Sequence, residues 1–173
     1  SILFVILIYA LYGLIDDLVE LGRKIKIFLP ILFSIPLISV INPETLWLPI
    51  IGDVSLNSSI YFDITWNDLF RILVIPLYVM VVSNLVNMHS GYNGLQSGLS
   101  FILLLTIIIK SWFDGSLNSI LVACAFLGSI LAFLIFNRYP AQVFEGNIGS
   151  QLFGSLIGCV IVIQNYWWFG FFI

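Results

Sequence analysis

The stretch Leu117-Asn-Ser-Ile-Leu-Val-Ala-Cys-Ala-Phe-Leu-Gly-Ser-Ile-Leu-Ala-Phe-Leu-Ile-Phe136 decides the fold class, because it contains no charged residue. As an α-helix it would measure about 30 Å, which is the thickness of the hydrocarbon core of a bilayer. Hydrophobic residues make up 61% of the 173-residue chain and charged residues only 9%, against about 25% charged residues in soluble domains. The stretch therefore predicts a transmembrane helix, and the composition predicts a polytopic membrane protein.

Apolar runs on both sides of this stretch predict an all-α, multi-span transmembrane helix bundle. The first run, Ser1–Ile15, is short, and the aromatic stretch Tyr166–Ile173 has no polar end. We therefore expect residues 1–173 to form a single transmembrane domain, the central part of a longer protein. The long polar connection Asn42–Asn67 alternates from Gly52 to Asp63, which predicts a small external β-hairpin. The fuller candidate spans are Ile27–Ile41, which contains Pro30 and Pro36, and Leu69–Asn87, Leu95–Phe113, Leu117–Phe136 and Ile148–Gln164.

The loops of such a bundle alternate between the two sides of the membrane. Loops Asp16–Lys26, Met88–Gly94 and Asn137–Asn147 then share one side, which carries four Lys and Arg residues against two on the other. The excess of positive charge places that side in the cytoplasm. Its polar residues gather in loops, whereas a channel would distribute them through its spans. The formal net charge of −3 argues against a nucleic-acid partner.

The first of these loops begins with two adjacent carboxylates, Asp16 and Asp17. Such a pair repels unless a cation or a function compensates. One carboxylate could hold a divalent metal ion and the other could position a proton on a phosphate. Alternatively, the pair marks a solvated span boundary. Lys26, at the mouth of the next run, could pair with a phosphate or anchor the span at the interface.

The other two loops are rich in asparagine and glycine. Asn87 and Asn93 stand among glycines that favour turns, and an asparagine oxygen is a neutral ligand for Mg²⁺. The stretch Phe144-Glu-Gly-Asn-Ile-Gly-Ser150 opens a span. A glycine-rich turn there can offer free N–H groups and the positive end of the helix dipole to an anion. The deeper glycines of this span could instead serve close helix packing.

Taken in order, these motifs resemble the polyprenyl-phosphate N-acetylhexosamine-1-phosphate transferases. The motifs are Gly-Leu-Ile-Asp-Asp (13–17), Lys26, Asn-x-x-Asn-x-x-x-Gly-x-Asn-Gly-Leu (84–95) and Tyr-Pro-Ala-x-Val-Phe-x-Gly (139–146). The chain looks closer to the eukaryotic and archaeal dolichyl-phosphate GlcNAc-1-phosphate transferase branch, and is related to the bacterial phospho-MurNAc-pentapeptide translocase. Members typically have about ten spans, so the resemblance implies that a further substrate loop lies beyond Ile173.

The resemblance implies a reaction on the cytoplasmic face. N-acetylhexosamine 1-phosphate passes from UDP-N-acetylhexosamine to a polyprenyl phosphate of the dolichyl type, with release of UMP. The implied cofactor is Mg²⁺, with Mn²⁺ as an alternative. The implied roles are catalysis for Asp16 and Asp17, substrate binding for Lys26, Asn93, Phe144 and Gly146, and metal binding for Asn87 and Asn147.

Asn147 departs from the family pattern, which usually has a metal-binding aspartate at this position. Asparagine keeps an oxygen donor but removes a negative charge, so we expect weaker metal binding. Glu145 could compensate or, on a turn, could point away. The chain could therefore be an active enzyme or a catalytically weakened relative that binds the UDP-sugar or the lipid phosphate. A membrane transporter is the alternative from another class. Membrane lipids are expected partners, and a homodimer is left open.

Overall fold

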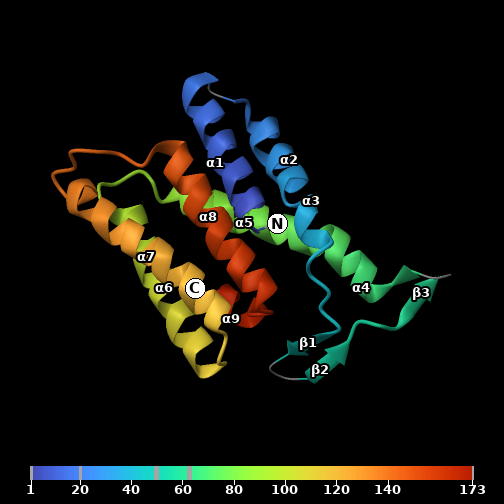
Figure 1. Ribbon diagram of the computed structural model, residues 1–173. Helices are drawn as coiled ribbons and strands as arrows, with labels where there is room; N and C mark the ends of the chain where they lie inside the picture. The colour runs from blue at the N-terminus through green and yellow to red at the C-terminus, as the bar shows by residue number, and fades with distance from the viewer. Residues whose placement is uncertain (1, 20, 49–50, 62–63, 173) are drawn as a thin grey trace.

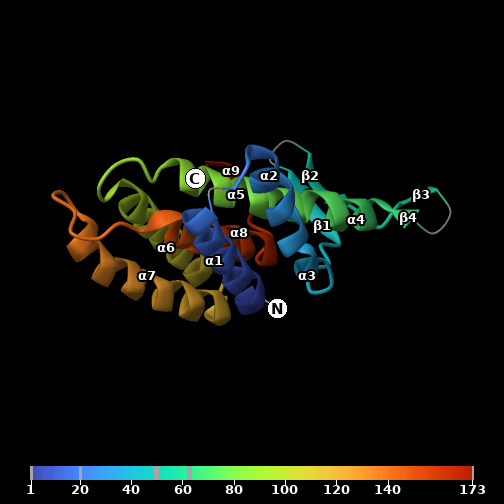
Figure 2. The same ribbon diagram turned by 90° about the horizontal axis from the view of Figure 1, so that it is seen from above.

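The computed structural model describes residues 2–19, 21–48, 51–61 and 64–172, and within them the chain is mostly helical (Figure 1; Figure 2). Five of the described helices are long and apolar enough to cross a membrane, which confirms the predicted fold class. They are α1 (Ile2–Val19), the helix Trp66–Met88, α6 (Leu95–Phe113), α7 (Leu117–Asn137) and α8 (Gly146–Ile163). The short α9 (Trp167–Phe172) follows α8.

The helix Trp66–Met88 consists of three parts: α4 (Trp66–Leu69), a π-helical turn (Phe70–Val74) and α5 (Ile75–Met88). Thr65 starts it with a capping box. The Thr65 hydroxyl accepts a hydrogen bond from the Asp68 N–H (3.2 Å), and the Asp68 carboxylate accepts one from the Thr65 N–H (3.0 Å). These two bonds satisfy backbone donors that the first turn would otherwise leave free.

The predicted span Ile27–Ile41 is wrong as a single helix. The structure has α2 (Arg23–Phe33) and α3 (Ile35–Ile38), which separate at Ser34. Pro36 has no N–H to bond to the carbonyl four residues earlier. Separately, the Pro30 carbonyl accepts a hydrogen bond from the Tyr9 hydroxyl of α1 (2.8 Å). Together, α2 and α3 still run back alongside α1 (Figure 1), so the loops keep the alternation expected from the sequence.

Two small antiparallel strand pairs lie at the far end of the molecule from the α1–α2 connection (Figure 1). The predicted hairpin exists, but with a different pairing. The strand β2 (Gly52–Ser55) pairs with the preceding β1 (Thr45–Leu48), and β3 (Ser59–Tyr61) pairs with β4 (Ile64–Thr65). The residues that connect each pair, 49–50 and 62–63, lie outside the described residues.

Helix α8 lies between α1 and α5 and packs closely against both, while α6 and α7 form an antiparallel pair beside them (Figure 1; Figure 2). Glycines allow this close approach. A Cβ added at Gly154 would lie 2.5 Å from the Cα of Ser83, and one added at Gly158 would lie 3.2 Å from the Cα of Val79. Small residues at such crossings are the usual means by which membrane helices associate.

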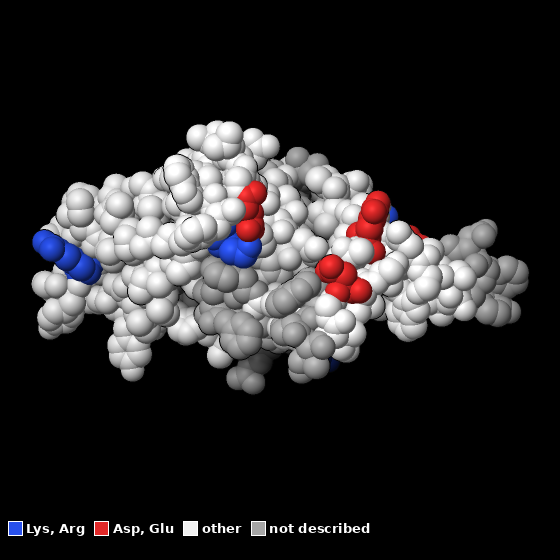
Figure 3. Space-filling view, turned by 90° about the horizontal axis from the view of Figure 1, so that it is seen from below, with Lys and Arg blue, Asp and Glu red and all other residues white. Residues whose placement is uncertain are grey.

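The outer faces of the bundle are apolar. Leucines on α1 are strongly exposed, for example Leu3 (70%) and Leu18 (74%). The space-filling view from below shows only a few charged side chains on a surface that is otherwise uncharged wherever it is described (Figure 3). An apolar exterior of this kind suits a hydrocarbon environment, so the chain is an integral membrane protein.

Candidate functional site

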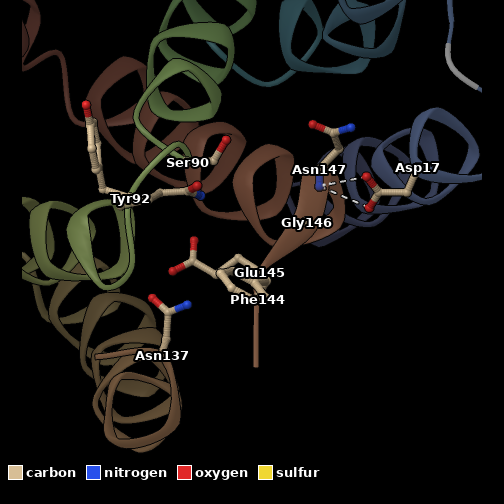
Figure 4. Close-up of a pocket in the computed structure, with 9 residues that line it drawn as sticks. Asp17, Ser90, Tyr92, Asn137, Phe144, Glu145, Gly146 and Asn147 are labelled. Carbon is tan, nitrogen blue, oxygen red and sulfur yellow. Dashed lines mark hydrogen bonds between the residues drawn. The ribbon is translucent and has the colours of Figure 1, made fainter. Parts of the chain in front are cut away.

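The end of the bundle where α1 and α7 finish and α8 begins contains a cavity of about 180 Å³ (Figure 4). All three of the polar loops singled out in the sequence contribute to it. We call it the polar cavity, and its lining residues are Asp17, Ser90, Tyr92, Gln96, Asn137, Phe144, Glu145, Gly146 and Asn147. The structure thus brings together segments that lie up to 130 residues apart in the chain.

Asp17 caps the first turn of α8. Its carboxylate accepts hydrogen bonds from the N–H of Asn147 (3.1 and 3.0 Å) and from the N–H of Ile148 (3.4 Å). The sequence suggested that these N–H groups would be free for an anionic ligand, but a carboxylate of the chain itself occupies them. The negative charge also lies favourably at the positive end of the helix dipole.

Two glycines make this capping contact possible. A Cβ added at Gly13 would lie 2.4 Å from the carbonyl oxygen of Asn147, so only glycine lets α1 approach α8 closely enough. Gly146 has a φ of +61°, and a Cβ there would lie 2.7 Å from a carboxylate oxygen of Asp17. Glycine at position 146 therefore meets both a backbone and a steric requirement.

Asp16 is almost completely buried, at 2% exposed, so the alternative that the aspartate pair marks a solvated span boundary is wrong for Asp16. Its carboxylate forms an ion pair with the Lys26 ammonium (2.8 Å) and accepts a hydrogen bond from the Leu21 N–H (3.0 Å). These partners compensate the burial of the charge and fix the connection between α1 and α2. Neither Asp16 nor Lys26 lines the polar cavity.

Asn137 ties the second polar loop to the third, a role that sequence reasoning missed. Its amide oxygen accepts hydrogen bonds from the Gly94 N–H (3.0 Å) and the Ser97 hydroxyl (2.7 Å). Its amide nitrogen donates to the Val143 carbonyl (2.9 Å). The available signal in the sequence was a polar residue directly after the mainly apolar run Leu117–Phe136.

Two further polar side chains line the cavity: Gln96, which sequence reasoning missed, and Glu145, whose direction it left open. Gln96 is 2% exposed; its amide oxygen accepts a hydrogen bond from the Ser150 hydroxyl (2.9 Å), but its amide nitrogen has no partner among the described residues. Both carboxylate oxygens of Glu145 are buried and likewise lack a hydrogen bond. Burial raises the pKa of Glu145, and the nearby hydroxyl and backbone N–H of Ser97 oppose that rise.

The sequence-predicted site residues divide into two groups. Asp17, Phe144, Gly146 and Asn147 line the polar cavity, whereas Asp16, Lys26, Asn87 and Asn93 do not. Asn87 nevertheless lies nearby. Because Val79 and Ser83 face Gly158 and Gly154, helix periodicity places Asn87, two turns beyond Val79 on α5, opposite Ser150 of α8.

The oxygen atoms that lack a donor suit a divalent cation. No group of three or more His, Cys, Asp or Glu residues that could hold a metal is found in the described part of the chain. The amide oxygen of Asn87 and the carboxylate of Glu145 are, however, buried acceptors without partners. Mg²⁺ is usually bound through one or two carboxylates together with substrate phosphates. Asn87 and Glu145 thus each offer the kind of oxygen that such an ion takes as a ligand.

A second cavity, of about 220 Å³, lies between α5, α6 and α8 and is mainly apolar. Its lining includes Leu85, Leu103 and Ile157, and it shares Gln96 with the polar cavity. A polar site and an apolar groove thus meet at one buried amide side chain.

Comparison with known proteins agrees with the family resemblance that the sequence motifs indicated. The family model described as glycosyl transferase family 4 matches residues 1–165. Provisionally named UDP-N-acetylglucosamine–dolichyl-phosphate N-acetylglucosaminephosphotransferases are 34% identical over 89% of this chain and 46% of their own in Saccharolobus solfataricus, and 36% identical over 92% and 47% in Sulfolobus acidocaldarius. The phospho-N-acetylmuramoyl-pentapeptide-transferase of Lacticaseibacillus paracasei is 32% identical over 96% of this chain and 52% of its own. The chain spans about half the length of the curated relatives it matches.

Proposed function

Because this chain belongs to glycosyl transferase family 4, we propose that it forms part of a membrane enzyme that transfers a sugar 1-phosphate to a polyprenyl phosphate. The donor is a UDP-N-acetylhexosamine, the acceptor is of the dolichyl type, and the reaction takes place on the cytoplasmic face. The names of the relatives support the donor and the acceptor. The observation that carries the proposal is the meeting of all three polar loops around one cavity.

The reaction joins the lipid phosphate and the sugar phosphate into a diphosphate, without a covalent enzyme intermediate. An oxygen of the lipid phosphate attacks the β-phosphorus of the UDP-sugar and forms a new P–O bond. The bond between that phosphorus and the bridging oxygen breaks, and UMP leaves with the electron pair. Catalysis of such a transfer consists mainly of positioning and electrostatic stabilisation.

Asp17 is the acidic residue best placed to meet the lipid phosphate. Its carboxylate lines the cavity and accepts hydrogen bonds from the N–H groups of Asn147 and Ile148. When Asp17 turns to orient or accept a proton of the phosphate, these N–H groups become free to bind a phosphate oxygen. The buried Asp16–Lys26 pair holds this end of α1 in place, and Lys26 can exchange its partner for a substrate phosphate.

Phe144 and Asn93 complete the nucleotide side of the proposed site. Phe144 is 68% exposed at the cavity, so its ring is available to stack on uracil. Asn93 lies in the same loop as Ser90 and Tyr92, which line the cavity, and supplies an amide for the base edge. Gly146 allows the backbone to approach the ligand.

A divalent cation, Mg²⁺ or Mn²⁺, would be held by Asn87 and Asn147 together with the substrate. The cation supplies neutralisation of the negative charge that develops on the diphosphate. The unpartnered oxygen of Asn87 supports this assignment.

The test is a transfer assay with the purified full-length natural protein, radiolabelled UDP-GlcNAc and a polyprenyl phosphate in detergent. We expect label to enter the organic phase as lipid-linked sugar, with one UMP released per transfer. Asp16→Ala and Asp17→Ala should each abolish product while the protein still inserts. Failure to label lipid with any UDP-N-acetylhexosamine, or wild-type turnover by the double variant, would contradict the proposal.

A second candidate is a weakened relative that binds donor or acceptor without efficient transfer, which Asn147 favours because it lacks the carboxylate that the resemblance implies. Calorimetric titration with UDP-GlcNAc separates the two candidates. Binding without transfer by the wild type, together with transfer by Asn147→Asp, would identify the weakened relative.

A further inference from the structure

Glu145 is the residue in the polar cavity that most needs a partner. It immediately precedes α8, and both of its carboxylate oxygens are buried without a hydrogen bond. An ionised carboxylate that is withdrawn from water is strongly unfavourable unless a donor or a cation compensates it. Unsatisfied buried groups of this kind usually mark a bound water, ion or ligand.

Ser97 supplies only part of that compensation, because its hydroxyl and backbone N–H are neutral groups that lower the pKa of Glu145 less than burial raises it. No Lys or Arg lines the polar cavity, and the ion pairs formed within the described ranges, Asp16 with Lys26 and Asp114 with Lys110, do not involve Glu145. The N–H groups of Asn147 and its successor point to Asp17, and the Ser97 hydroxyl donates to Asn137. Among the described residues Glu145 therefore has no positively charged partner, and a bound cation would supply one.

The polar cavity also contains a hydrogen-bond donor that needs an acceptor. The amide nitrogen of Gln96 is a buried donor without an acceptor, in a side chain that is 98% buried and lines the same cavity as Glu145. A cation alone would satisfy Glu145 but not Gln96. A divalent cation that carries a diphosphate satisfies both, because the carboxylate meets the metal and the amide meets a phosphate oxygen.

The orientation of the side chains separates Glu145 from Asn147. In Figure 4 the Glu145 carboxylate points to the part of the cavity where Ser90, Tyr92 and Asn137 lie, whereas the amide of Asn147 points away from it. We propose that Glu145 supplies the metal-directed negative charge of this site, in place of a carboxylate at position 147. The inference rests on the metal-dependent part of the proposed function.

The test measures metal binding directly, with Mn²⁺ as a paramagnetic probe. The purified full-length natural protein, stripped with a chelator and saturated with UDP, is titrated with Mn²⁺ while the signal of the free ion is followed by electron paramagnetic resonance. The variants are Glu145→Gln, Asn147→Asp and the double variant. Glu44→Gln is the matched control, because Glu44 is exposed near β1 and remote from the cavity.

We expect Glu145→Gln to weaken Mn²⁺ binding by at least about tenfold, since even groups that only position metal ligands are worth about 10- to 100-fold. Asn147→Asp should restore most of the affinity in the Glu145→Gln background, and Glu44→Gln should match the wild type. Equal Mn²⁺ affinity in the wild type and Glu145→Gln would overturn the inference. Absence of Mn²⁺ binding by the wild type with UDP would overturn it as well.

A stability measurement covers the case in which the variant folds poorly. Without metal, Glu145→Gln removes an uncompensated buried charge and should melt at the same temperature as the wild type or higher. A lower melting temperature would show that Glu145 has a structural partner and would overturn the inference. Transfer by the wild type, assayed in parallel, separates the two proposals: transfer with unchanged metal affinity in Glu145→Gln refutes only this one, and Glu145-dependent metal binding without transfer refutes only the function.

Discussion

Replacement of Gly13 by alanine tests the packing that positions the polar cavity. A Cβ at this position would lie 2.4 Å from the carbonyl oxygen of Asn147 and 2.8 Å from the Cα of Ile148. Ordinary van der Waals contact begins at 3.4 Å, so α1 and α8 would have to separate by about 1 Å. Overpacking of this kind costs about 1–3 kcal/mol, which corresponds to a melting temperature lower by roughly 2–12 °C for a protein of this size.

The same displacement should impair the reaction, because it moves the Asn147 backbone away from Asp17. A misplacement of about 1 Å can lower a rate about 100-fold. Thermal melting in detergent and the radiolabel transfer assay measure the two effects. Gly128→Ala is the matched control: Gly128 lies within α7, and a Cβ there meets nothing within 4 Å. If Gly13→Ala melts and turns over like this control, the close crossing of α1 and α8 is refuted.

Other substitutions probe separate contacts. Asp17→Ala should destabilise the protein by about 0.5–2 kcal/mol through the lost cap of α8; an unchanged melting temperature would argue against the cap. Asn137→Ala should cost about 1–3 kcal/mol, because it leaves the buried Ser97 hydroxyl and the part-buried Gly94 N–H without their acceptor, and should accelerate hydrogen exchange at the Gly94 amide. Asp114 lies outside the spans, and its hydrogen bonds with Lys110 and Tyr166 hold its pKa below the usual value. Because the pKa of Asp114 is lower in the folded than in the unfolded protein, its ionised form stabilises the fold above the unfolded-state pKa of about 4. This stabilisation is lost as the pH falls through the pKa of the folded state. Asp114→Asn should therefore remove this part of the decrease in melting temperature between neutral and acidic pH.

The transmembrane helices could be predicted from the sequence because the bilayer imposes one simple requirement. A spanning segment must satisfy its backbone internally and be apolar over its whole length, and the predicted Leu95–Phe113 coincides with α6. The break at Ser34 was missed because Pro30 and Pro36 were expected to be tolerated within one span. Tyr9 and the Ser34 hydroxyl instead bind the Pro30 carbonyl, and such partners are not visible in the local sequence.

Helix packing could not be predicted, because in a membrane the outside is as apolar as the inside. Leu3 is 70% exposed, whereas Ser83 and Ser155 are completely buried. Hydrophobicity therefore does not tell which face of a span meets another helix, and small or weakly polar residues mark the contact instead. The burial of Asp16 also escaped prediction, because it depends on the ion pair with Lys26 on the other side of the α1–α2 connection.

The candidate site was predictable in outline only. Alternation of the loops placed Asp17 and Asn147 at the same end of the bundle, and the structure brings them into contact. The pairing of the Asp17 carboxylate with the start of α8 and the bridge from Asn137 to Gly94 join residues 130 and 43 positions apart. No spacing rule reaches over such distances. The metal and substrate roles of these residues stay predictions until the assays above are performed.

The position of α8 between α1 and α5 has a consequence for the biogenesis of the protein. The share of buried residues is 67% in α8 and 17% in the most apolar window of α7, and α8 carries Ser150, Gln151 and Ser155 towards its neighbours. Such a helix is a weaker candidate than α7 for entering the lipid alone, since polar side chains raise the cost of insertion. Synthesis runs from the N-terminus, so α1 and α5 are already in the membrane when α8 emerges. The order of the helices in the gene thus gives α8 two partner helices that are inserted before it. A permuted chain that begins with α8 should be poorly inserted.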